Sequence, residues 1–212
     1  MDFNTFIKQL DDLKKQDLGG LEAQFKLAPE LRLAYNQQKI ASKNPKKAAV
    51  LALFYPSEST NEVLLLLTQR ASYKGTHSSQ ISFPGGKVEK NDNSLAQTAI
   101  RETFEEVGIR KNEIRIIREM TPVYIPPSNF LATPYMGFTL ARPSFKTNHE
   151  VAEIIEVNLK ELLLEKNITT VAMTTSYMNK TKVPAFSIQN KIIWGATAMM
   201  LSEIKDLLKM VI

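Results

Sequence analysis

The chain has 212 residues, of which 43% are hydrophobic and 23% charged; these proportions exclude a disordered chain and allow one large domain with a buried core. The formal net charge is +5, from 27 Lys and Arg against 22 Asp and Glu, and because the cations are spread along the chain we expect a basic surface that attracts small polyanions, not a nucleic-acid partner. The sequence has no cysteine, which excludes disulfides, thiolate metal sites and a cysteine nucleophile.

No segment resembles a membrane span or a targeting signal. Even the longest apolar run, residues 48–55, is far short of the roughly 20 apolar residues that a span requires. The N-terminal residues, MDFN, lack the basic start and apolar stretch of a signal peptide. We therefore expect no membrane partner and a cytoplasmic location.

The first 40 residues are expected to be helical. Apolar side chains recur at helical spacing at Phe3, Phe6, Ile7 and Leu10. Gly19 and Gly20 are expected to end this segment, and Pro29 interrupts a second helical stretch. We therefore divide the chain into an N-terminal helical extension, residues 1–45, packed on a domain of residues 46–212.

Beyond residue 47 the pattern changes to strands interrupted by helices. Strands are expected at residues 48–55, 62–70, 80–83, 113–119, 135–140 and 151–157, and in a hairpin of 185–188 and 191–194. Helices are expected at residues 94–107, 159–165 and 196–210. Strands and helices in this order favour a mixed sheet with helices on both sides.

The helix at residues 94–107 has the clearest signals. Ser94 and Gln97 form a capping box, and Gly108 follows the last helical residue. The expected core stripe consists of Ala96, Ile100, Phe104 and Val107. The opposite side carries three carboxylates, Glu102, Glu105 and Glu106.

These carboxylates conflict with the helix that carries them. Each close pair of like charges costs a few tenths of a kcal/mol, and the last two turns of a helix favour cations. Such a conflict is expected where function requires it. Glu102 and Glu106 are one turn apart, so both side chains reach one hard cation. Ligation by oxygen alone points to Mg²⁺ or Mn²⁺.

A longer pattern around these acids resembles the signature of the Nudix hydrolase family, G-x5-E-x7-R-E-U-x-E-E-x-G-U, in which U is a bulky apolar residue. Residues 86–92, GKVEKND, and 101–109, RETFEEVGI, follow its frame. Asp92 stands where the signature has Glu, Thr103 stands at an apolar position, and one extra residue separates Asp92 from Arg101. The closing R-E-x-x-E-E-x-G is intact.

This resemblance implies an α/β fold, a Nudix-like α/β/α sandwich with a mixed β-sheet, in residues 46–212. The divalent-cation ligands that it implies are Glu102, Glu105, Glu106 and the backbone carbonyl of Gly86. Asp92 and Arg101 would form a structural pair between the loop and the helix. The implied cofactor is Mg²⁺ or Mn²⁺.

The resemblance also implies hydrolysis of a diphosphate linked to a nucleoside, in which a metal-activated water attacks one phosphorus in line. Glu105 and Glu106 are the expected catalytic residues. The general base stays open between Glu105 and an acid of a later loop, Glu150 or Glu153. For the last two, a solvent-facing strand edge explains the sequence at least as well.

Residues 66–71, LLTQRA, and 83–86, FPGG, resemble the additional signature of the coenzyme A pyrophosphatase subfamily, L-L-T-x-R-[SA]-x3-R-x3-G-x3-F-P-G-G. Gly75 and Ser79 stand where that signature has Arg and Gly. Two downstream segments are also similar to the subfamily: residues 125–130, IPPSNF, and residues 193–197, IWGAT.

The subfamily resemblance implies that coenzyme A or a thioester of it is cleaved to 3′,5′-ADP and 4′-phosphopantetheine. The residues expected to bind its phosphates are Arg70, whose planar fork suits phosphate oxygens, and then Lys74 and Lys87. His77 is more simply an incidental loop residue. Trp194 and Tyr124 are candidates for stacking on adenine, although a core position is preferred for Trp194.

Two alternatives stay open. The first keeps the chemistry on another nucleoside diphosphate derivative, such as ADP-ribose, NADH or a nucleoside triphosphate, because Gly75 and Ser79 depart from the subfamily signature. The second is a non-catalytic nucleotide- or RNA-binding module, which the intact acidic residues disfavour. A homodimer is neither predicted nor excluded.

Overall fold

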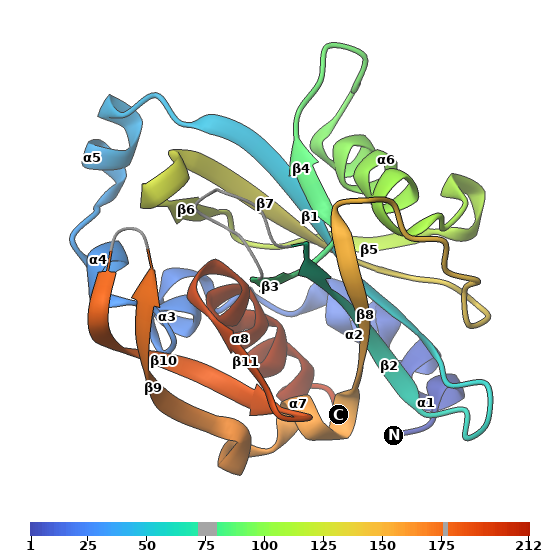
Figure 1. The fold of residues 1–212 in the computed structure, drawn as a ribbon. Helices are drawn as coiled ribbons and strands as arrows, with labels where there is room; N and C mark the ends of the chain where they lie inside the picture. Colours follow the sequence, from blue (N-terminus) through green and yellow to red (C-terminus); the bar gives the residue numbers. More distant parts are fainter. Residues whose placement is uncertain (72–79, 176–177) are drawn as a thin grey trace.

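Two β-sheets organise the molecule (Figure 1). The computed structural model describes residues 1–71, 80–175 and 178–212. The strands are β1 (Lys46–Pro56), β2 (Val63–Arg70), β3 (Ile81–Ser82), β4 (Gly85–Lys87), β5 (Arg115–Glu119), β6 (Val123–Ile125), β7 (Phe130–Phe138), β8 (Val151–Asn158), β9 (Ile168–Thr175), β10 (Met178–Ile188) and β11 (Lys191–Trp194). The α-helices are α1 (Phe3–Lys8), α2 (Leu10–Lys15), α3 (Gly20–Phe25), α4 (Glu30–Leu33), α5 (Gln37–Ser42), α6 (Leu95–Val107), α7 (Leu159–Leu163) and α8 (Gly195–Lys209). Three 3₁₀ turns are η1 (Lys111–Glu113), η2 (Pro126–Ser128) and η3 (Glu165–Asn167).

The larger sheet is mixed. Its central path is β3-β2-β1-β7-β5, with β4 paired to β1, β6 to β7 and β8 to β2. Strands β1 and β7 are parallel, whereas β1 pairs antiparallel with β2 and β4. The central strand β1 is buried along most of its length, as expected for a strand covered on both faces. The predicted mixed sheet is confirmed.

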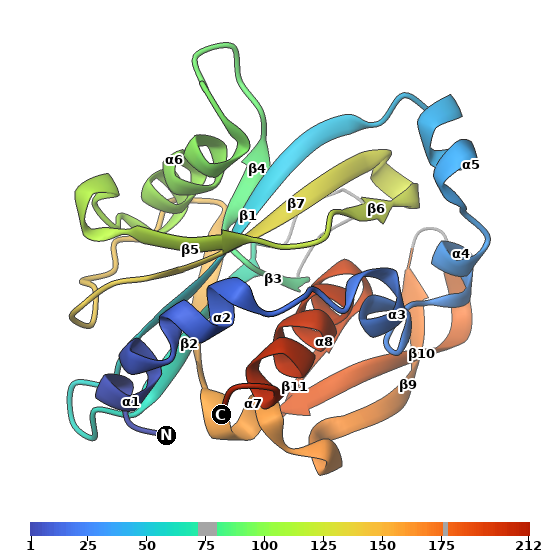
Figure 2. The same cartoon turned by 180° about the vertical axis from the view of Figure 1, so that it is seen from behind.

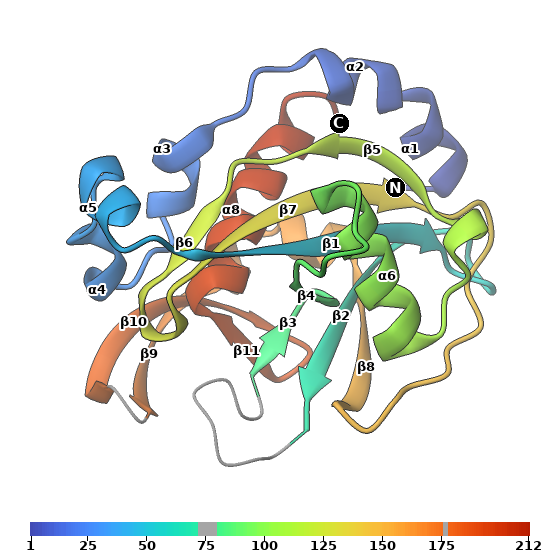
Figure 3. The same ribbon diagram turned by 90° about the horizontal axis from the view of Figure 1, so that it is seen from above.

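Helices cover both faces of this sheet (Figure 3). On one face α6 closes a cluster that includes Leu51, Leu53, Leu66 and Val107. On the other face α8 and the N-terminal helices close a larger cluster that includes Phe54, Leu65, Phe186 and Leu201. The α/β/α sandwich is therefore confirmed, since the sheet alternates its side chains between two covered faces.

The second sheet is antiparallel and consists of β11-β10-β9. It includes the predicted hairpin, in which Ile188 pairs with Lys191. Its central strand contributes Phe186 and Ile188 to the larger core cluster together with α8. The turn from β11 into α8 lies between the two sheets and, as shown below, borders the site.

The N-terminal helices share the main core. Phe3, Phe6 and Leu13 are buried in the same cluster as the sheet and α8, and Figure 2 shows α3 beside α8. Glu203 of α8 accepts hydrogen bonds from the Gly20 N–H at 3.0 Å and from the Gln24 amide at 3.1 Å. These contacts hold the extension against the rest of the chain, whereas the boundary at residue 45 stays a prediction.

Several expected elements differ from those in the structure. Gly20, with φ +58°, is the first residue of α3 and does not end a longer helix. Strand β7 begins at Phe130, five residues before its predicted start at Tyr135. Strands β4, β6 and β9 were not expected. Strand β4 is the sequence Gly-Gly-Lys, which has no intrinsic strand preference and is extended only because it pairs with β1.

The predicted core face of α6 is wrong at Phe104 and right at Val107, which is fully buried. Phe104, expected in the core, is 45% exposed, and Lys111 lies over its ring. The residues that α6 buries are Thr98, Ala99, Thr103, Glu106 and Val107. The reason is close packing: small side chains let α6 approach β1 and β4, and the Thr103 hydroxyl is satisfied by donating to the Ala99 carbonyl at 2.7 Å. Ala96 and Ile100 are only partly buried against this core.

Among the described residues, no helix has the length and apolar composition needed to cross a bilayer.

Candidate active site

Helix α6 is fixed at both ends as the sequence predicted. The Ser94 Oγ accepts from the Gln97 N–H at 3.2 Å, and the Gln97 Oε1 in turn accepts from the Asn93 N–H at 2.9 Å. Gly108 ends the helix in the left-handed region, with φ +77°. The predicted caps at Ser94 and Gly108 are confirmed, although the Gln97 side chain binds the N–H of Asn93 and not that of Ser94.

Two glycines bring the backbone of β4 against this helix. A Cβ on Gly85 would lie 2.4 Å from the Ala49 carbonyl oxygen, and Gly85 has φ +153°. A Cβ on Gly86 would lie 2.4 Å from Oε1 of Glu102. Only glycine, which has no Cβ, fits at these two positions without a clash. The Glu102 carboxylate therefore lies directly against the backbone of Gly86, as the predicted ligand set requires.

Glu106 is the most buried of the three helix acids, with 4% of its surface exposed. Its Oε2 accepts from the Gly85 N–H at 3.2 Å, and its Oε1 lies 3.7 Å from Nη1 of Arg70. Burial raises the pKa of Glu106 to about 7, although Arg70 and the Gly85 N–H act in the opposite direction. This carboxyl thus changes its protonation state near neutral pH.

Glu102 and Glu105 both contact Arg101. Nη1 of Arg101 donates to Glu102 at 3.0 Å and to Glu105 at 3.1 Å. Burial raises the pKa of Glu102, and Arg101 opposes that shift. The Glu105 side chain is 49% exposed, so the three acids differ strongly in their contact with solvent.

Arg101 also joins the predicted structural partner. Its Nε and Nη2 donate to the two carboxylate oxygens of Asp92 at 3.0 and 2.9 Å, and Nη2 also donates to the Lys87 carbonyl at 3.0 Å. Arg101 therefore holds the pKa of Asp92 well below its usual range. Asp92 also accepts from the Thr98 hydroxyl at 2.9 Å. The structure brings the pair together between loop and helix.

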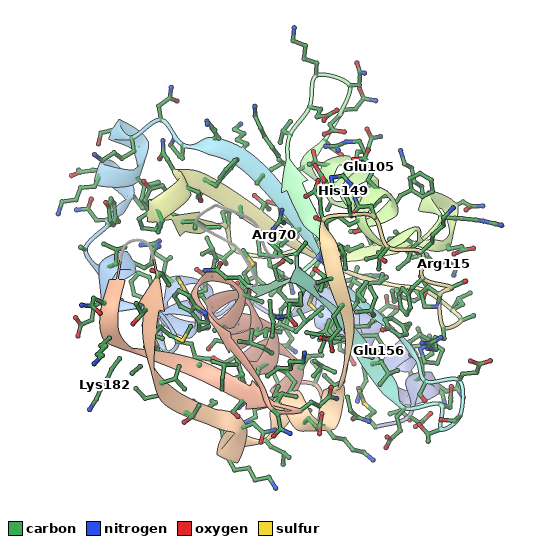
Figure 4. The ribbon with its side chains drawn as sticks, viewed as in Figure 1. Arg70, Glu105, Arg115, His149, Glu156 and Lys182 are labelled. Atoms are coloured by element: carbon green, nitrogen blue, oxygen red, sulfur yellow. The ribbon has the colours of Figure 1, made fainter. Side chains whose placement is uncertain are left out.

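Arg70, at the end of β2, lies between two acids. Besides Glu106, its Nη2 contacts Glu150 at 3.0 Å. Figure 4 shows Arg70 toward the middle of the molecule and Glu105 on α6. Glu153, the other later acid, pairs with Lys191 on β11 instead. Of the two later acids, Glu150 is the one that contacts a predicted site residue.

A cavity of about 470 Å³ lies beside the acidic helix. The predicted site residues among its lining are Arg70, Gly86, Lys87, Glu102, Glu106 and Glu150. Glu105 is not among the lining residues. Lys74 and His77, together with Gly75 and Ser79, lie outside the described residues. The cavity therefore joins most, but not all, of the predicted site.

Other parts of the chain complete this cavity. Its described lining also includes Phe83, Ile125, Ser128, Phe130 and the segment Trp194, Gly195, Ala196 and Thr197. Trp194, for which a core position was preferred, is partly buried and faces the cavity. Tyr124 is buried and packs on Tyr35, with ring centroids 5.1 Å apart. In the sequence, these lining residues belong to the two subfamily-like segments at residues 125–130 and 193–197.

The donor set suits a hard divalent cation. Glu102, Glu106 and the Gly86 backbone supply oxygen atoms beside one another at the cavity wall. Among the described residues, no three carboxylate or imidazole side chains converge closely enough to bind an ion in their present rotamers. Glu105 differs from the other two because it does not line the cavity and its side chain is 49% exposed, so it would need another rotamer to join them.

Comparisons with known proteins agree with this geometry. The NUDIX domain family model matches residues 45–172. An uncharacterised Nudix hydrolase of Yersinia pestis, NudL, is 32% identical over 160 residues, covering 75% of this chain and 78% of the relative. The same identity and coverage hold for NudL of Yersinia pseudotuberculosis.

Solved structures share the fold. The Nudix hydrolase RenU of M. smegmatis matches with a TM-score of 0.55 and 15% identity, over 79% of this chain and 88% of that one. A MutT/nudix family protein of Enterococcus faecalis matches with a TM-score of 0.51 and 18% identity, over 100% of this chain and 70% of that one. The chain therefore belongs to the Nudix hydrolase family, enzymes that act on the diphosphate bond of nucleoside diphosphate derivatives and generally use divalent cations such as Mg²⁺ or Mn²⁺.

Proposed function

We propose that the protein hydrolyses the diphosphate bond of coenzyme A or its thioesters, giving 3′,5′-ADP and 4′-phosphopantetheine or its acyl form. The observation that carries this proposal is the single cavity that joins the acidic face of α6 to two cationic side chains. Glu102 and Glu106 line it, and so do Arg70 and Lys87. A substrate with several phosphates requires both kinds of group.

The subfamily-like segments support coenzyme A in particular. They are far apart in the sequence, at residues 66–71, 83–86, 125–130 and 193–197. Each contributes to the same cavity, through residues such as Arg70, Phe83, Ile125 and Trp194. Segments that surround one cavity are suited to recognising one ligand, which supports a substrate as large as coenzyme A.

The residues that line the cavity have different expected roles. Glu102, Glu106 and the Gly86 carbonyl would hold the divalent cation, with Glu105 joining them by a change of rotamer. A bound divalent cation supplies charge neutralisation at the phosphate oxygens and lowers the pKa of water. Arg70 would exchange its contacts with Glu106 and Glu150 for phosphate oxygens, which its planar fork matches.

The proton acceptor is Glu105 or Glu150. Glu150 lines the cavity, 3.0 Å from Arg70, whereas Glu105 does not. In the reaction, water oxygen forms a bond to one phosphorus, the bridging P–O bond breaks, and the water proton passes to the base. Glu105→Gln and Glu150→Gln separate the two, because only the variant that lacks the base loses the acidic limb of the pH–rate profile.

A substrate panel tests the proposal. The purified protein is incubated with coenzyme A, acetyl-coenzyme A, ADP-ribose, NADH and a nucleoside triphosphate, with Mg²⁺ or Mn²⁺, and products are identified by mass spectrometry. We expect coenzyme A and its thioester to have the highest kcat/KM, with 3′,5′-ADP as a product. Rapid cleavage of ADP-ribose with coenzyme A untouched would contradict the proposal.

Glu106→Gln provides the matched site variant. It keeps the shape of the side chain and is expected to reduce kcat roughly hundredfold or more. Glu113→Gln is the control, because Glu113 is exposed in the turn after α6 and does not line the cavity. Parental activity in Glu106→Gln would count against the assigned site, whatever the preferred substrate.

A further inference from the structure

Trp194 also lines a second, smaller cavity. It measures about 50 Å³, enough for a group of roughly four or five heavy atoms. It shares Ile125, Trp194, Gly195 and Ala196 with the large cavity, so the two meet at the start of α8. Its other described walls are mostly apolar and come from β6, η2, α8 and the N-terminal extension: Pro29, Leu31, Arg32, Tyr124, Pro126, Pro127 and Met199.

The one arginine that lines this small cavity is Arg32 of α4. Only 3% of the surface of this residue is exposed to solvent. Within the described part of the chain, no carboxylate lies within ion-pair distance of it, and Nε has no hydrogen-bond partner. Burial lowers the pKa of Arg32, yet an arginine stays charged in a protein. Burying a cation without a counter-ion costs free energy of folding, and an anion bound beside it would reduce this cost.

The guanidinium is held in a fixed orientation. Nη1 donates to the Tyr35 carbonyl at 2.8 Å, and the guanidinium carbon lies 5.2 Å from the centre of the Phe25 ring. These contacts use one donor and one face of the group and neutralise none of its charge. Nε is fully buried, and Nη2 makes no hydrogen bond to the described residues, so Nη2 is the donor left for an anion in the small cavity.

The start of α8 supplies a second positive element. Trp194 is the N-cap and makes no side-chain capping bond, so the first N–H groups of this helix lack the partner that a Ser or Asp would provide. Gly195 has φ +67°, and nothing lies within 4 Å of the place where its Cβ would be. The N-terminus of a helix favours anions, and here it opens on both cavities.

We propose that Arg32 and the N-terminus of α8 form a second anion subsite, which takes the ribose 3′-phosphate of the substrate while the diphosphate lies at the acidic helix. This inference rests on the proposed function for the identity of the phosphate. The apolar walls strengthen the electrostatic attraction because they exclude water. The N-terminal extension thereby contributes to substrate selection as well as to the core.

Binding of two nucleotides tests the subsite without turnover. Calorimetry compares 3′,5′-ADP with 5′-AMP, which differ only in the 3′-phosphate. In the parent protein 3′,5′-ADP is expected to bind at least tenfold more tightly, a typical effect of charge-assisted hydrogen bonds. Arg32→Met removes the charge while keeping an unbranched side chain, and it is expected to bring the ratio of the two affinities close to one.

The control is Arg110→Met, at an exposed arginine before η1, which is expected to keep the parental ratio. Arg32→Lys keeps the charge without the fork and is expected to give an intermediate ratio. Equal affinities of the parent for both nucleotides, or an unchanged ratio in Arg32→Met with an unchanged melting temperature, would overturn the subsite.

Kinetics separates this inference from the proposed function. Dephospho-coenzyme A has the same diphosphate but lacks the 3′-phosphate, and Arg32→Met is expected to raise the KM of coenzyme A relative to that of dephospho-coenzyme A roughly tenfold. If the parent cleaves neither compound but still prefers 3′,5′-ADP to 5′-AMP, the substrate is wrong and the subsite stands. If both are cleaved with an unchanged KM ratio in the variant, the subsite alone is wrong.

Discussion

Two arginines compensate the acidic side chains of α6. Arg101 contacts Glu102 and Glu105, and Arg70 lies 3.7 Å from Glu106. The repulsion expected from the spacing of these acids is therefore balanced within the chain itself. Arg101 also binds Asp92 with two hydrogen bonds, which limits its movement, whereas the Arg70 Nε has no described partner. Arg70 is the arginine better placed to exchange partners when a ligand enters.

Glu106 makes the stability of the metal-free protein depend on pH. Its pKa is about 7 in the folded chain and near its ordinary value of about 4.3 in the unfolded chain. Between these values the folded state binds a proton that the unfolded state has released, so the free energy of unfolding falls as pH rises through this range. The loss from this group is on the order of 3–4 kcal/mol.

Glu106→Gln is expected to remove that loss. In denaturant titrations with a chelator at pH 5 and pH 8, the variant is expected to be as stable as the parent at pH 5 and more stable at pH 8. Glu113→Gln, an exposed carboxyl, serves as the control. Equal losses between the two pH values in the parent and Glu106→Gln would show that this carboxyl does not carry the dependence.

At the scale of the element, α6 is turned about its axis relative to the predicted orientation: Val107 stays in the core, and Phe104 faces solvent. An apolar stripe normally marks the buried side of a helix, but here small and acidic side chains turn toward β1 and β4. Ala99 and Thr103 are fully buried, and Phe104 is 45% exposed. This orientation brings Glu102 and Glu106 to the cavity wall, which the predicted orientation would have placed in solvent.

A pair of variants tests this orientation. Ala99→Leu inserts a large side chain between α6 and the sheet and is expected to cost about 1–3 kcal/mol or more, through overpacking. Phe104→Ala is expected to cost about 1 kcal/mol or less, well below the roughly 3–5 kcal/mol of a core phenylalanine. Unfolding midpoints in urea, with unchanged slopes, measure both. A larger loss of stability in Phe104→Ala than in Ala99→Leu would contradict the observed orientation and support the predicted core face.

At the scale of the whole molecule, the N-terminal extension completes the core on the face of the sheet opposite α6. Phe3, Phe6, Leu13 and Leu27 are each 3% exposed or less and belong to the cluster formed by the sheet and α8. Arg118 of β5 donates to the Leu13 carbonyl at 2.6 Å. The family model begins at residue 45, so these N-terminal core residues lie outside the part of the chain that it describes.

Removal of residues 1–45 is expected to prevent cooperative folding. Each buried large apolar side chain contributes about 1.5–3 kcal/mol to stability. The loss of several of them together approaches the free energy of unfolding of a typical domain, about 5–15 kcal/mol. We expect the truncated chain to bind a hydrophobic dye and to show no sharp thermal transition. A cooperative transition within a few degrees of the parent would contradict this role.

Point variants keep this prediction testable if the truncated chain aggregates. Leu13→Ala, at a fully buried position, is expected to cost about 2–5 kcal/mol. Leu33→Ala is the control, because Leu33 is 49% exposed in the same extension, and its cost is expected to stay below about 1 kcal/mol. Equal costs for the two variants would mean that the extension does not contribute to the core.

The sequence by itself determined the features that depend on neighbouring residues. The caps Ser94 and Gly108, the strands β1 and β2, and the spacing of Glu102 and Glu106 follow from local rules that hold in any context. The signature around these acids was sufficient to predict the family and the fold. These predictions succeeded because helix periodicity, capping and motif spacing involve residues within a few positions of one another.

Only the tertiary structure decided which residues share a surface. It turned Phe104 outward and Glu106 inward, brought Trp194 to the cavity, and left Arg32 buried without a carboxylate among the described residues. Burial depends on what packs opposite a side chain, and for Arg32 and Trp194 those neighbours lie more than 150 residues apart in the chain. Local patterns contain no information about such pairs, because the close approach of α6 and α8 to the strands is a property of the assembled core.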